Sequence, residues 1–556
     1  MRFPGIVHHS AGTRRRKSRG PVLERFERRV LLSTFTVDNT ADDGLGSLRW
    51  AILQVNADTT PSTIAFDIPG AGIRTISLAS ALAPITRPVL IDGRSQPDYS
   101  GLPLVRLDGQ ALSAGQNGLV IAGGDSTVAG LIFTGFSGAG VVLTINGGNF
   151  VESSTIGLDP AGFSAQPNGD GVLVFHSSHN TIGGPSSSAG NLISGNLGNG
   201  VKIVGTQLDT IGNQIFGNLI GTSRDGLGSL GNGLDGVLIS GGRGTVVGGA
   251  AAGLGNVISG NRMNGLELNS GASGSQITGN AVGLTVDRTR ALGNRLDGVL
   301  LDGAPMTTIG GITAGAGNQI SGNNGNGVRT RNDATGLVFQ GNQVGTDPTA
   351  VLRLGNLGAG LLIGAGSSMI GGYSQGAGNT IAFNGSGAIG AGVQFAGPVS
   401  GVSILSNSIH DNAGLGIAFG DGPSPNRTPT NGPGPNNWQN HPILSSAQSN
   451  GGTTQLMGTL TAAPAKSYSI QVFWSLQPDP SGFGEGTVYL GTDTVITDQT
   501  GQVAFTIPYL GGAAPGGFLS VTATSPSGDT SEFSQAILLR PVSDLGVRLD
   551  ATPDPA

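Results

Sequence analysis

Short hydrophobic runs separated by glycine-rich and polar turns recur along the middle of this chain. Four segments open at Gly157, Gly221, Gly283 and Gly345, at steps of 64, 62 and 62 residues. Within each segment the same phrases return in the same order, among them DGVLV (170–174), DGVLI (235–239), DGVLL (297–301) and AGLLI (359–363). Repetition at a fixed interval predicts a solenoid, in which each unit buries its aliphatic side chains only by stacking on its neighbours.

The shortest repeated step indicates the size of one coil. The run GLVI at 118–121 returns as GVVL at 140–143, a step of 22 residues. A unit of 62–64 residues then holds two coils and two insertions, one after the IGG strand and a longer one after IGT. Helical solenoids do not fit because the repeat lacks a 3.6-residue period, and propeller blades need longer strands. The pattern predicts an all-β protein with a right-handed, single-stranded parallel β-helix of roughly ten to fourteen coils.

The β-helix prediction makes a specific statement about side chains. The valines and leucine that open successive strands, Val172, Val201, Val237 and Leu266, must lie in one column or in two parallel columns. The asparagines of the recurring GN pairs are expected to stack at the corners, because Asn tolerates turn conformations and can hydrogen-bond its neighbour in the next coil.

Both ends of the repeat differ from it. Near the start, Leu48, Ile52 and Val55 follow helical spacing with Ser47 as the N-cap, so we expect a short helix that covers the first coil. After the repeat, alternating runs separated by turn residues predict a β-sandwich. The expected organisation is a basic disordered leader or sorting segment (1–33), cap and first coils (34–110), β-helix repeats (111–420), a Pro/Gly/Asn linker (421–442), a β-sandwich (443–540) and a tail that resembles the start of a truncated further module (541–556).

Composition narrows the class of protein. The chain has 100 glycines in 556 residues, few aromatic side chains and no cysteine, which excludes a disulfide framework, thiolate metal sites and Cys nucleophiles. The net charge is −6. Residues 1–30 carry nine basic and two acidic side chains, so the remainder, with 19 basic and 32 acidic groups, has a net charge of −13 and argues against nucleic-acid binding. No run of 18 apolar residues is present, so no membrane span is predicted.

Several segments resemble those of known surface proteins. Residues 21–33, PVLERFERRVLLS, follow a basic cluster and resemble the LEPR-XLL-like leader of exported planctomycete proteins. The stretch NTADDGLGSLRWAI at 39–52 is similar to the opening of bacterial surface β-helix repeat proteins, and SGFGEGTVYLG at 481–491 resembles part of an Ig-like module found behind such helices. The resemblance implies a secreted or cell-surface β-helix protein. The junction at 421–442 resembles an often Asp-rich, calcium-suited segment, yet it keeps only Asp421, so no cofactor is expected and Ca²⁺ is a weak alternative.

Candidate chemistry gathers on the recurring long loop. Its acidic residues return near its start and at its end, and arginines accompany them; the candidate ligand ridge comprises Asp159, Asp170, Asp225, Asp235, Asp287, Asp297, Asp347, Arg224, Arg290 and Arg295. Equivalent aspartates two coils apart are separated by about 9.6 Å, too far to share one metal ion. Elsewhere, His176 and His179 lack a third ligand for a metal site, and His410-Asp411 replaces a usual corner. No catalytic or metal residue is therefore assigned.

Two functions remain open at this point. The first is a non-catalytic surface or adhesion protein, a monomer whose partners are polysaccharide or cell-envelope components. The alternative is a polysaccharide-binding or polysaccharide-cleaving enzyme, either pectate-lyase-like or glycoside-hydrolase-like, that acts along the groove of the β-helix. Uniform uncharged faces would favour the first, whereas an acid and base cluster beside a cleft would favour the second.

Overall fold

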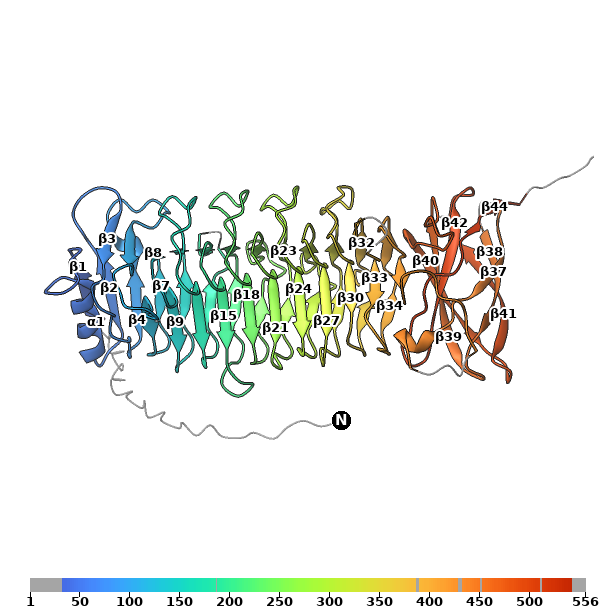
Figure 1. The fold of residues 1–556 in the computed structure, drawn as a ribbon, viewed down its shortest axis with the longest axis horizontal. Coiled ribbons are helices and arrows are strands. Elements are labelled where there is room, and N and C mark those ends of the chain that lie inside the picture. The colour runs from blue at the N-terminus through green and yellow to red at the C-terminus, as the bar shows by residue number, and fades with distance from the viewer. Residues whose placement is uncertain are drawn as a thin grey trace, which may run out of the picture.

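The protein is a rod closed by a short helix at one end and a β-sandwich at the other (Figure 1). The computed structural model describes residues 33–186, 188–386, 390–428, 433–450, 453–510 and 513–542. The predicted leader lies outside the described residues except for Ser33, and so does the tail beyond Val542.

Three long parallel sheets, which we call sheets A, B and C, form the walls of the rod. Sheet A has 13 strands among the described residues: β1 (Ser33–Val37), β2 (Ser62–Phe66), β4 (Val89–Asp92), β7 (Thr127–Ala129), β10 (Phe150–Glu152), β13 (Thr181–Gly183), β16 (Gln214–Phe216), β19 (Val246–Val247), β22 (Gln276–Ile277), β25 (Thr308–Gly310), β28 (Val338–Gln340), β31 (Met369–Gly371) and β34 (Ser403–Leu405). Sheet B has 12: β3 (Arg74–Ser77), β5 (Val105–Asp108), β8 (Leu131–Thr134), β11 (Thr155–Ile156), β14 (Leu192–Ile193), β17 (Leu219–Ile220), β20 (Val257–Ile258), β23 (Ala281–Val282), β26 (Gln319–Ile320), β29 (Gln343–Val344), β32 (Thr380–Ala382) and β35 (Ser408–His410).

Sheet C completes each coil and faces the viewer in Figure 1. Its 11 strands within the described ranges are β6 (Leu119–Ile121), β9 (Val141–Thr144), β12 (Val172–Phe175), β15 (Val201–Val204), β18 (Val237–Ser240), β21 (Leu266–Asn269), β24 (Val299–Asp302), β27 (Val328–Arg331), β30 (Leu361–Ile363), β33 (Val393–Phe395) and β36 (Ile417–Ala418). From β4 to β33, each strand pairs in parallel with the strand that lies three further along the chain, as in a right-handed parallel β-helix with three strands in each coil. The predicted fold class is therefore confirmed.

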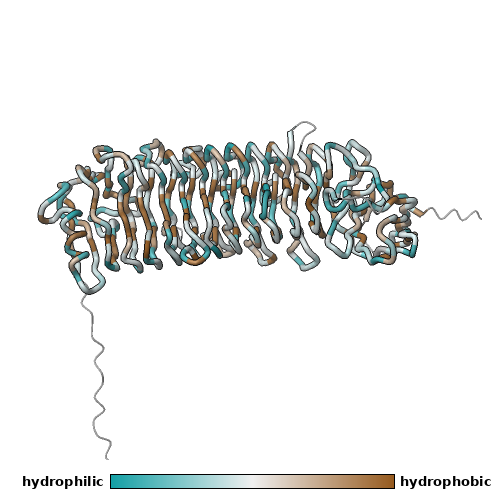
Figure 2. Tube along the Cα trace, turned by 60° about the horizontal axis from the view of Figure 1, so that its bottom comes forward, coloured by the Kyte–Doolittle hydropathy of each residue, from teal (hydrophilic) through white to brown (hydrophobic). Residues whose placement is uncertain are grey.

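The interior is one continuous column of aliphatic side chains. Val172 pairs with Val201, Val201 with Val237, and Val237 with Leu266, and all four are fully buried. The predicted column is thus confirmed. Apolar segments follow one another from coil to coil along the whole rod (Figure 2). No coil buries these side chains by itself, so the stability of each coil depends on the coils above and below it.

The corners carry a second, polar column. At the corner between sheets B and C, Asn261 donates its backbone N–H (3.1 Å) and its Nδ2–H (2.9 Å) to Oδ1 of Asn294, and its own Oδ1 accepts the same two bonds from Asn232. This ladder comprises Asn168, Asn196, Asn232, Asn261, Asn294, Asn323, Asn356, Asn384 and Asn412. A parallel ladder between sheets A and B comprises Asn191, Asn218, Asn256, Asn280, Asn318, Asn342, Asn379 and Asn407. The expected stacking of the GN asparagines is observed.

A helix covers the first coil as predicted. α1 (Leu48–Ala57) buries Leu48, Ile52 and Val55, and the side chain of Ser47 accepts a hydrogen bond from the N–H of Trp50. The helix packs on β1 and β2 at the blue end of Figure 1 and so shields the open apolar end of the solenoid. A short 3₁₀ turn, η1 (Gly93–Ser95), follows β4.

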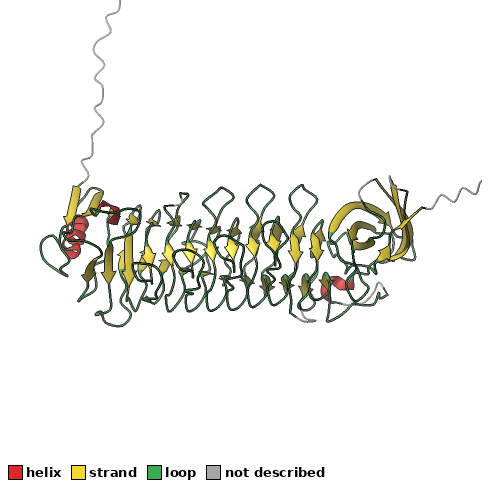
Figure 3. Ribbon diagram, turned by 90° about the horizontal axis from the view of Figure 1, so that it is seen from above, coloured by secondary structure: helices red, strands yellow, loops and turns green. Residues whose placement is uncertain are grey.

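The other end of the rod is covered by two four-stranded sheets (Figure 3). One sheet contains β41 (Gln502–Leu510), β38 (Thr453–Thr461), β37 (Ile443–Ser449) and β44 (Arg540–Pro541), and the other contains β40 (Val488–Ile496), β39 (Ser467–Ser475), β42 (Phe518–Thr524) and β43 (Ile537–Leu538). Residues of β38 alternate between buried and exposed positions, as the sequence predicts for a sandwich strand. The connection from the last coil includes the 3₁₀ turn η2 (Pro435–Trp438).

The sandwich is docked on the helix by apolar and polar contacts. Phe473 and Phe533 of the sandwich belong to the same buried cluster as the interior of the β-helix. Ile409 and Gly486 exchange two backbone hydrogen bonds of 2.9 and 2.8 Å. The buried carboxylate of Glu532 accepts a hydrogen bond from the N–H of Phe419 at 2.7 Å. These contacts hold the sandwich in a defined position on the last coils.

We expect the asparagine ladder to be a major contributor to stability. Replacing Asn261 by Ala leaves buried donors and acceptors of Asn232 and Asn294 without partners, at a cost of roughly 1–3 kcal/mol. The midpoint of thermal unfolding, followed by circular dichroism, should therefore fall clearly. The matched control is Asn324→Ala at the same corner, where the side chain is exposed and we expect a change within about 0.5 kcal/mol. Equal midpoints for the two variants would contradict a stabilising ladder.

Candidate functional site at the junction of helix and sandwich

The four long loops project from one edge of the rod, at the top of Figure 1 between teal and yellow. Their aspartates bind their own loops. Asp159 accepts from the N–H groups of Phe163 and Ser164 at 2.8 and 2.9 Å, and Asp225 accepts from the hydroxyl of Ser223 and the N–H of Leu227. These bonds lower the pKa of Asp225.

Asp287 and Asp347 close the third and fourth loops in the same way. The hydroxyl of Thr285 and the N–H of Thr289 donate to Asp287 and lower its pKa. Burial would raise the pKa of Asp347, but hydrogen bonds from Thr349 and from the backbone of Leu352 outweigh it and hold the pKa well below its usual range. All four carboxylates thus have a local role in loop closure.

Asp170, Asp235 and Asp297 lie in a third ladder, in which aspartate and asparagine alternate. Oδ1 of Asp170 accepts from the N–H of Asn199, whose Oδ1 accepts from the N–H of Asp235, and the pattern continues through Asn264, Asp297 and Asn326. Alternation keeps two carboxylates from stacking directly on each other. Asp235 is 4% exposed, and its burial raises its pKa to about 6.

The arginines of the predicted ridge differ in their surroundings. Arg224 is partly buried and reaches back to the first loop, where its Nε donates to the carbonyl of Ala161 at 2.9 Å. Arg290 and Arg295 are exposed. The structure therefore brings the ridge residues into a row without gathering them into one site, and a ligand ridge stays a prediction.

Neither the pair His176 and His179 nor the His410-Asp411 pair belongs to a cluster of three metal-binding side chains among the residues that the structure describes. Nδ1 of His176 lies 2.7 Å from Oδ2 of Asp209, and no group of three or more His, Asp or Glu side chains suited to a metal ion is found in the described part of the chain.

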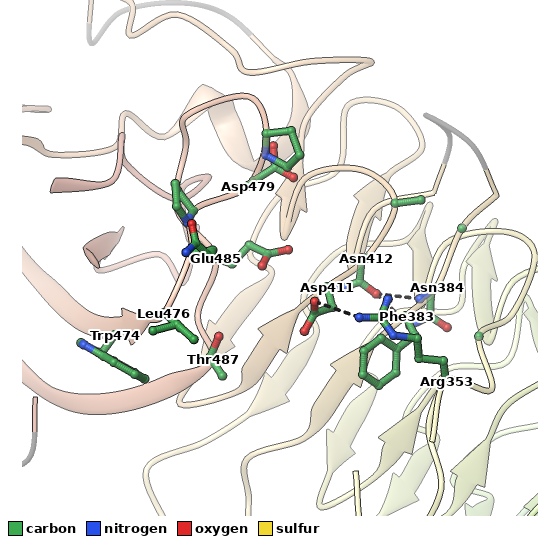
Figure 4. Close-up of a pocket in the computed structure, with 16 residues that line it drawn as sticks. Arg353, Phe383, Asn384, Asp411, Asn412, Trp474, Leu476, Asp479, Glu485 and Thr487 are labelled. Atoms are coloured by element: carbon green, nitrogen blue, oxygen red, sulfur yellow. Dashed lines mark hydrogen bonds and ion pairs between the residues drawn. The ribbon is translucent and has the colours of Figure 1, made fainter. Parts of the chain in front are cut away.

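A pocket of about 770 Å³ lies where the last coils of the β-helix meet the sandwich (Figure 4). The β-helix supplies one wall through Arg353, Phe383, Asn384, Asp411 and Asn412, and the sandwich supplies the other through Trp474, Leu476, Asp479, Glu485 and Thr487. The pocket thus combines two aromatic rings with acidic side chains from two parts of the chain.

Asp411 lies on the wall of the pocket that the β-helix supplies, between two basic groups. Its Oδ2 lies 2.8 Å from Nδ1 of His410, and its Oδ1 lies 3.6 Å from Nη2 of Arg353. Both partners pack on Phe383: the guanidinium of Arg353 lies 4.7 Å from the ring centroid, and the imidazole of His410 meets the ring edge to face at 5.9 Å. Phe383 therefore fixes the two groups that orient Asp411.

Glu485 faces Asp411 from the sandwich and has a different environment. Its side chain is 9% exposed, and burial raises the pKa of its carboxyl to about 7. Hydrogen bonds from the backbone of Asp411 and Asn412 oppose this rise, whereas the negative charges of Asp411 and Asp479 add to it. The pocket therefore contains one carboxyl that holds a proton near neutral pH and a second carboxylate beside an arginine.

Sequence reasoning found only part of this site. The sequence singles out His410-Asp411 because this pair replaces the usual corner, but it assigns the pair no catalytic role. Glu485 was missed, since it lies 74 residues further along in a different sheet system. Its loop, QPDPSGFGEGT at 477–487, is rich in proline and glycine and carries two acidic residues, which is the signal that was available.

The fold and the pocket define a right-handed parallel β-helix protein with a carboxylate-lined junction site. No family model matches the sequence, and a search of curated proteins finds no match. Among solved structures, the chain is similar to the A-module of the mannuronan C-5 epimerase AlgE4 from Azotobacter vinelandii, at 15% identity and a TM-score of 0.33 over 68% of this chain and 92% of that one. It is also similar to the pectate lyase Pel9A, at 14% identity and a TM-score of 0.27 over 68% and 80% of the two chains.

A further similar structure is tailspike protein 3 of bacteriophage CBA120, at 14% identity and a TM-score of 0.21 over 66% of this chain and 58% of that one. Two of these proteins are named as enzymes of polysaccharides, mannuronan and pectate. The first interpretation of this chain, a non-catalytic adhesion protein, is corrected in favour of its alternative because the junction pocket gathers acidic and basic side chains in one cleft. The choice of site and chemistry below rests on the junction pocket alone.

Burial of Asp235 predicts a pH-dependent stability. Its pKa is raised from about 3.9 in the unfolded chain to about 6, so the folded state binds more protons and stability is lost as the pH rises between these values. Asp235→Asn removes this loss, and we expect its free energy of unfolding to exceed that of the wild type by roughly 3 kcal/mol at pH 7.5, with little difference at pH 4.

Thermal unfolding of both proteins from pH 4 to pH 8 checks this prediction. The exposed Asp333→Asn serves as a control for the loss of one charge, and its midpoint should follow the wild type throughout. A constant difference between Asp235→Asn and the wild type at all pH values would contradict a buried, titrating Asp235.

Proposed function

We propose that the chain is a secreted or cell-surface enzyme that hydrolyses a polysaccharide in the junction pocket. The observation that carries the proposal is the pairing of Glu485, a carboxyl protonated near neutral pH, with Asp411, a carboxylate held by Arg353 and His410. Hydrolysis of a glycosidic bond requires such a pair, one group as acid and the other as base or nucleophile.

The two carboxyl groups have separate roles in the proposed reaction. Glu485 donates its proton to the leaving glycosidic oxygen as the bond from that oxygen to the anomeric carbon breaks. Asp411 accepts a proton from the water that attacks the same carbon, so one product carries the hydroxyl of that water and the other carries the proton from Glu485. Proton exchange with solvent then returns both groups to their starting states.

The rest of the pocket suits a sugar chain. Trp474 and Phe383 supply aromatic surface, and Gln477 supplies an amide group for hydroxyls. The pocket opens at the surface between the last long loop and the sandwich (Figure 4), where a polymer has access. We further propose that the protein is exported, that its partner is an extracellular glycan, and that it is a monomer. No helix in the described part of the chain is long and apolar enough to cross a membrane.

Replacement of Glu485 tests the acid role. Glu485→Gln has nearly the same shape as the protonated side chain but donates no proton, so we expect cleavage to fall by about 100-fold or more. In the wild type, cleavage should decline as the pH rises above about 7, where Glu485 loses its proton. Release of reducing ends and of unsaturated ends is measured on a panel of neutral and acidic polysaccharides.

The control is Asp493→Asn, an exposed carboxyl on β40 outside the pocket, which should retain full activity. Asp411→Asn should lose activity as Glu485→Gln does. Wild-type cleavage by both pocket variants would refute the assignment, and absence of cleavage of every polysaccharide by the wild type would refute the proposed activity. Release of unsaturated ends would show a lyase instead.

A further inference from the structure

Arg224, on the second long loop, forms hydrogen bonds within the protein through only two of its three guanidinium nitrogens. Its Nε donates to the carbonyl of Ala161 at 2.9 Å, and its Nη2 donates to Oγ1 of Thr155 at 3.0 Å and to the carbonyl of Pro160 at 3.1 Å. These three bonds fix the plane of the guanidinium against the first loop and sheet B. They leave the two hydrogens of Nη1 without a partner among the described residues.

The guanidinium also lacks a counter-ion at short range. Some partly buried arginines elsewhere in the protein are paired, since Arg94 lies 2.7 Å from Glu152 and Arg331 lies 2.6 Å from Asp302, whereas Arg288, like Arg224, has no carboxylate partner within 4 Å in the described part of the chain. Within the described ranges no carboxylate lies within 4 Å of Arg224, although the charge of Asp159 reaches it. Burial lowers the pKa of Arg224, and the negative charge of Asp159 only partly opposes this effect.

Arg224 lines a small pocket of about 190 Å³ on the outer face of sheet B. Strands β11, β14 and β17 form its floor, and the short hydroxyl side chains of Ser153, Thr155 and Ser188 lie around it. Oγ1 of Thr155 accepts from Arg224, and Thr155 itself is buried, so this hydroxyl holds the guanidinium in place. The pocket therefore offers a positive charge and hydroxyl donors in a volume suited to one small charged group.

We propose that this pocket binds a carboxylate or sulfate group of an anionic polysaccharide. Nη1 of Arg224 donates to the oxyanion, and the exposed hydroxyl of Ser188, which lines the same pocket, donates a second bond. The site lies on the coils of β11 to β17, whereas the junction pocket lies on those of β32 and β35, so it anchors the polymer away from the bond that is cleaved. It goes beyond the proposed hydrolysis and does not depend on it.

Binding is measured in the Glu485→Gln background, so that no polymer is cleaved. Polygalacturonate tests the carboxylate, dextran sulfate tests the sulfate, and neutral dextran is the uncharged reference, each by isothermal titration at fixed salt. We expect Arg224→Gln to weaken binding of one or both anionic polymers by about tenfold or more. Loss with only one polymer identifies which group the pocket takes.

Two further variants separate binding from a structural effect. Ser188→Trp fills the mouth of the pocket and leaves Arg224 and its bonds to the first loop in place, and we expect the same loss of affinity. Arg290→Gln removes an exposed arginine from the next loop and should change affinity less than twofold. The proposal is overturned if the Arg224 and Ser188 variants bind as the parent does, if Arg290→Gln weakens binding equally, or if no anionic polymer binds.

Discussion

The fold depends on one constraint, the exact superposition of successive coils. Parallel pairing places Val201 over Val172 and Val237 over Val201, and the corner asparagines extend the same register with paired hydrogen bonds. A shift by one residue in any coil would turn its aliphatic side chains outward and would break both asparagine bonds to its neighbours. Register therefore leaves little freedom along the walls of the rod, and variation is confined to the loops and to the two ends.

The same constraint explains why the candidate active site lies at an end. Along the rod, ladder positions and loop positions are each repeated, so acidic residues such as Asp225 and Asp287 recur in equivalent places and are used to close their own loops. Two carboxyl groups in different environments can face each other only where the repeat is interrupted. The docked sandwich provides that break, because its loop brings Glu485 against the last corner, where Asp411 has replaced the usual sequence.

The extent to which the sequence predicts this protein follows from the range of the interactions. Helix capping by Ser47 and the column of Val172 and Leu266 depend on local spacing and on a repeat, so both were predicted. The loop aspartates were recognised as a group, but the sequence did not show that hydroxyl and backbone N–H groups of the same loops would bind them. The approach of Glu485 to Asp411 arises from docking between two separate folding units, and neither unit carries a motif that specifies the other.

One sequence difference between the repeats changes how the fourth long loop contacts the loop before it. The N–H of Arg224 donates to the carbonyl of Gly162, and the N–H of Val286 donates to the carbonyl of Gly226, so the second and third loops are each tied to the loop before them. The equivalent residue of the fourth loop is Pro348, which has no N–H and cannot form this bond. The fourth loop therefore lacks the backbone hydrogen bond that ties the second and third loops to their predecessors. The same loop carries Arg353, which lies 3.6 Å from Asp411 and so contributes to the junction pocket.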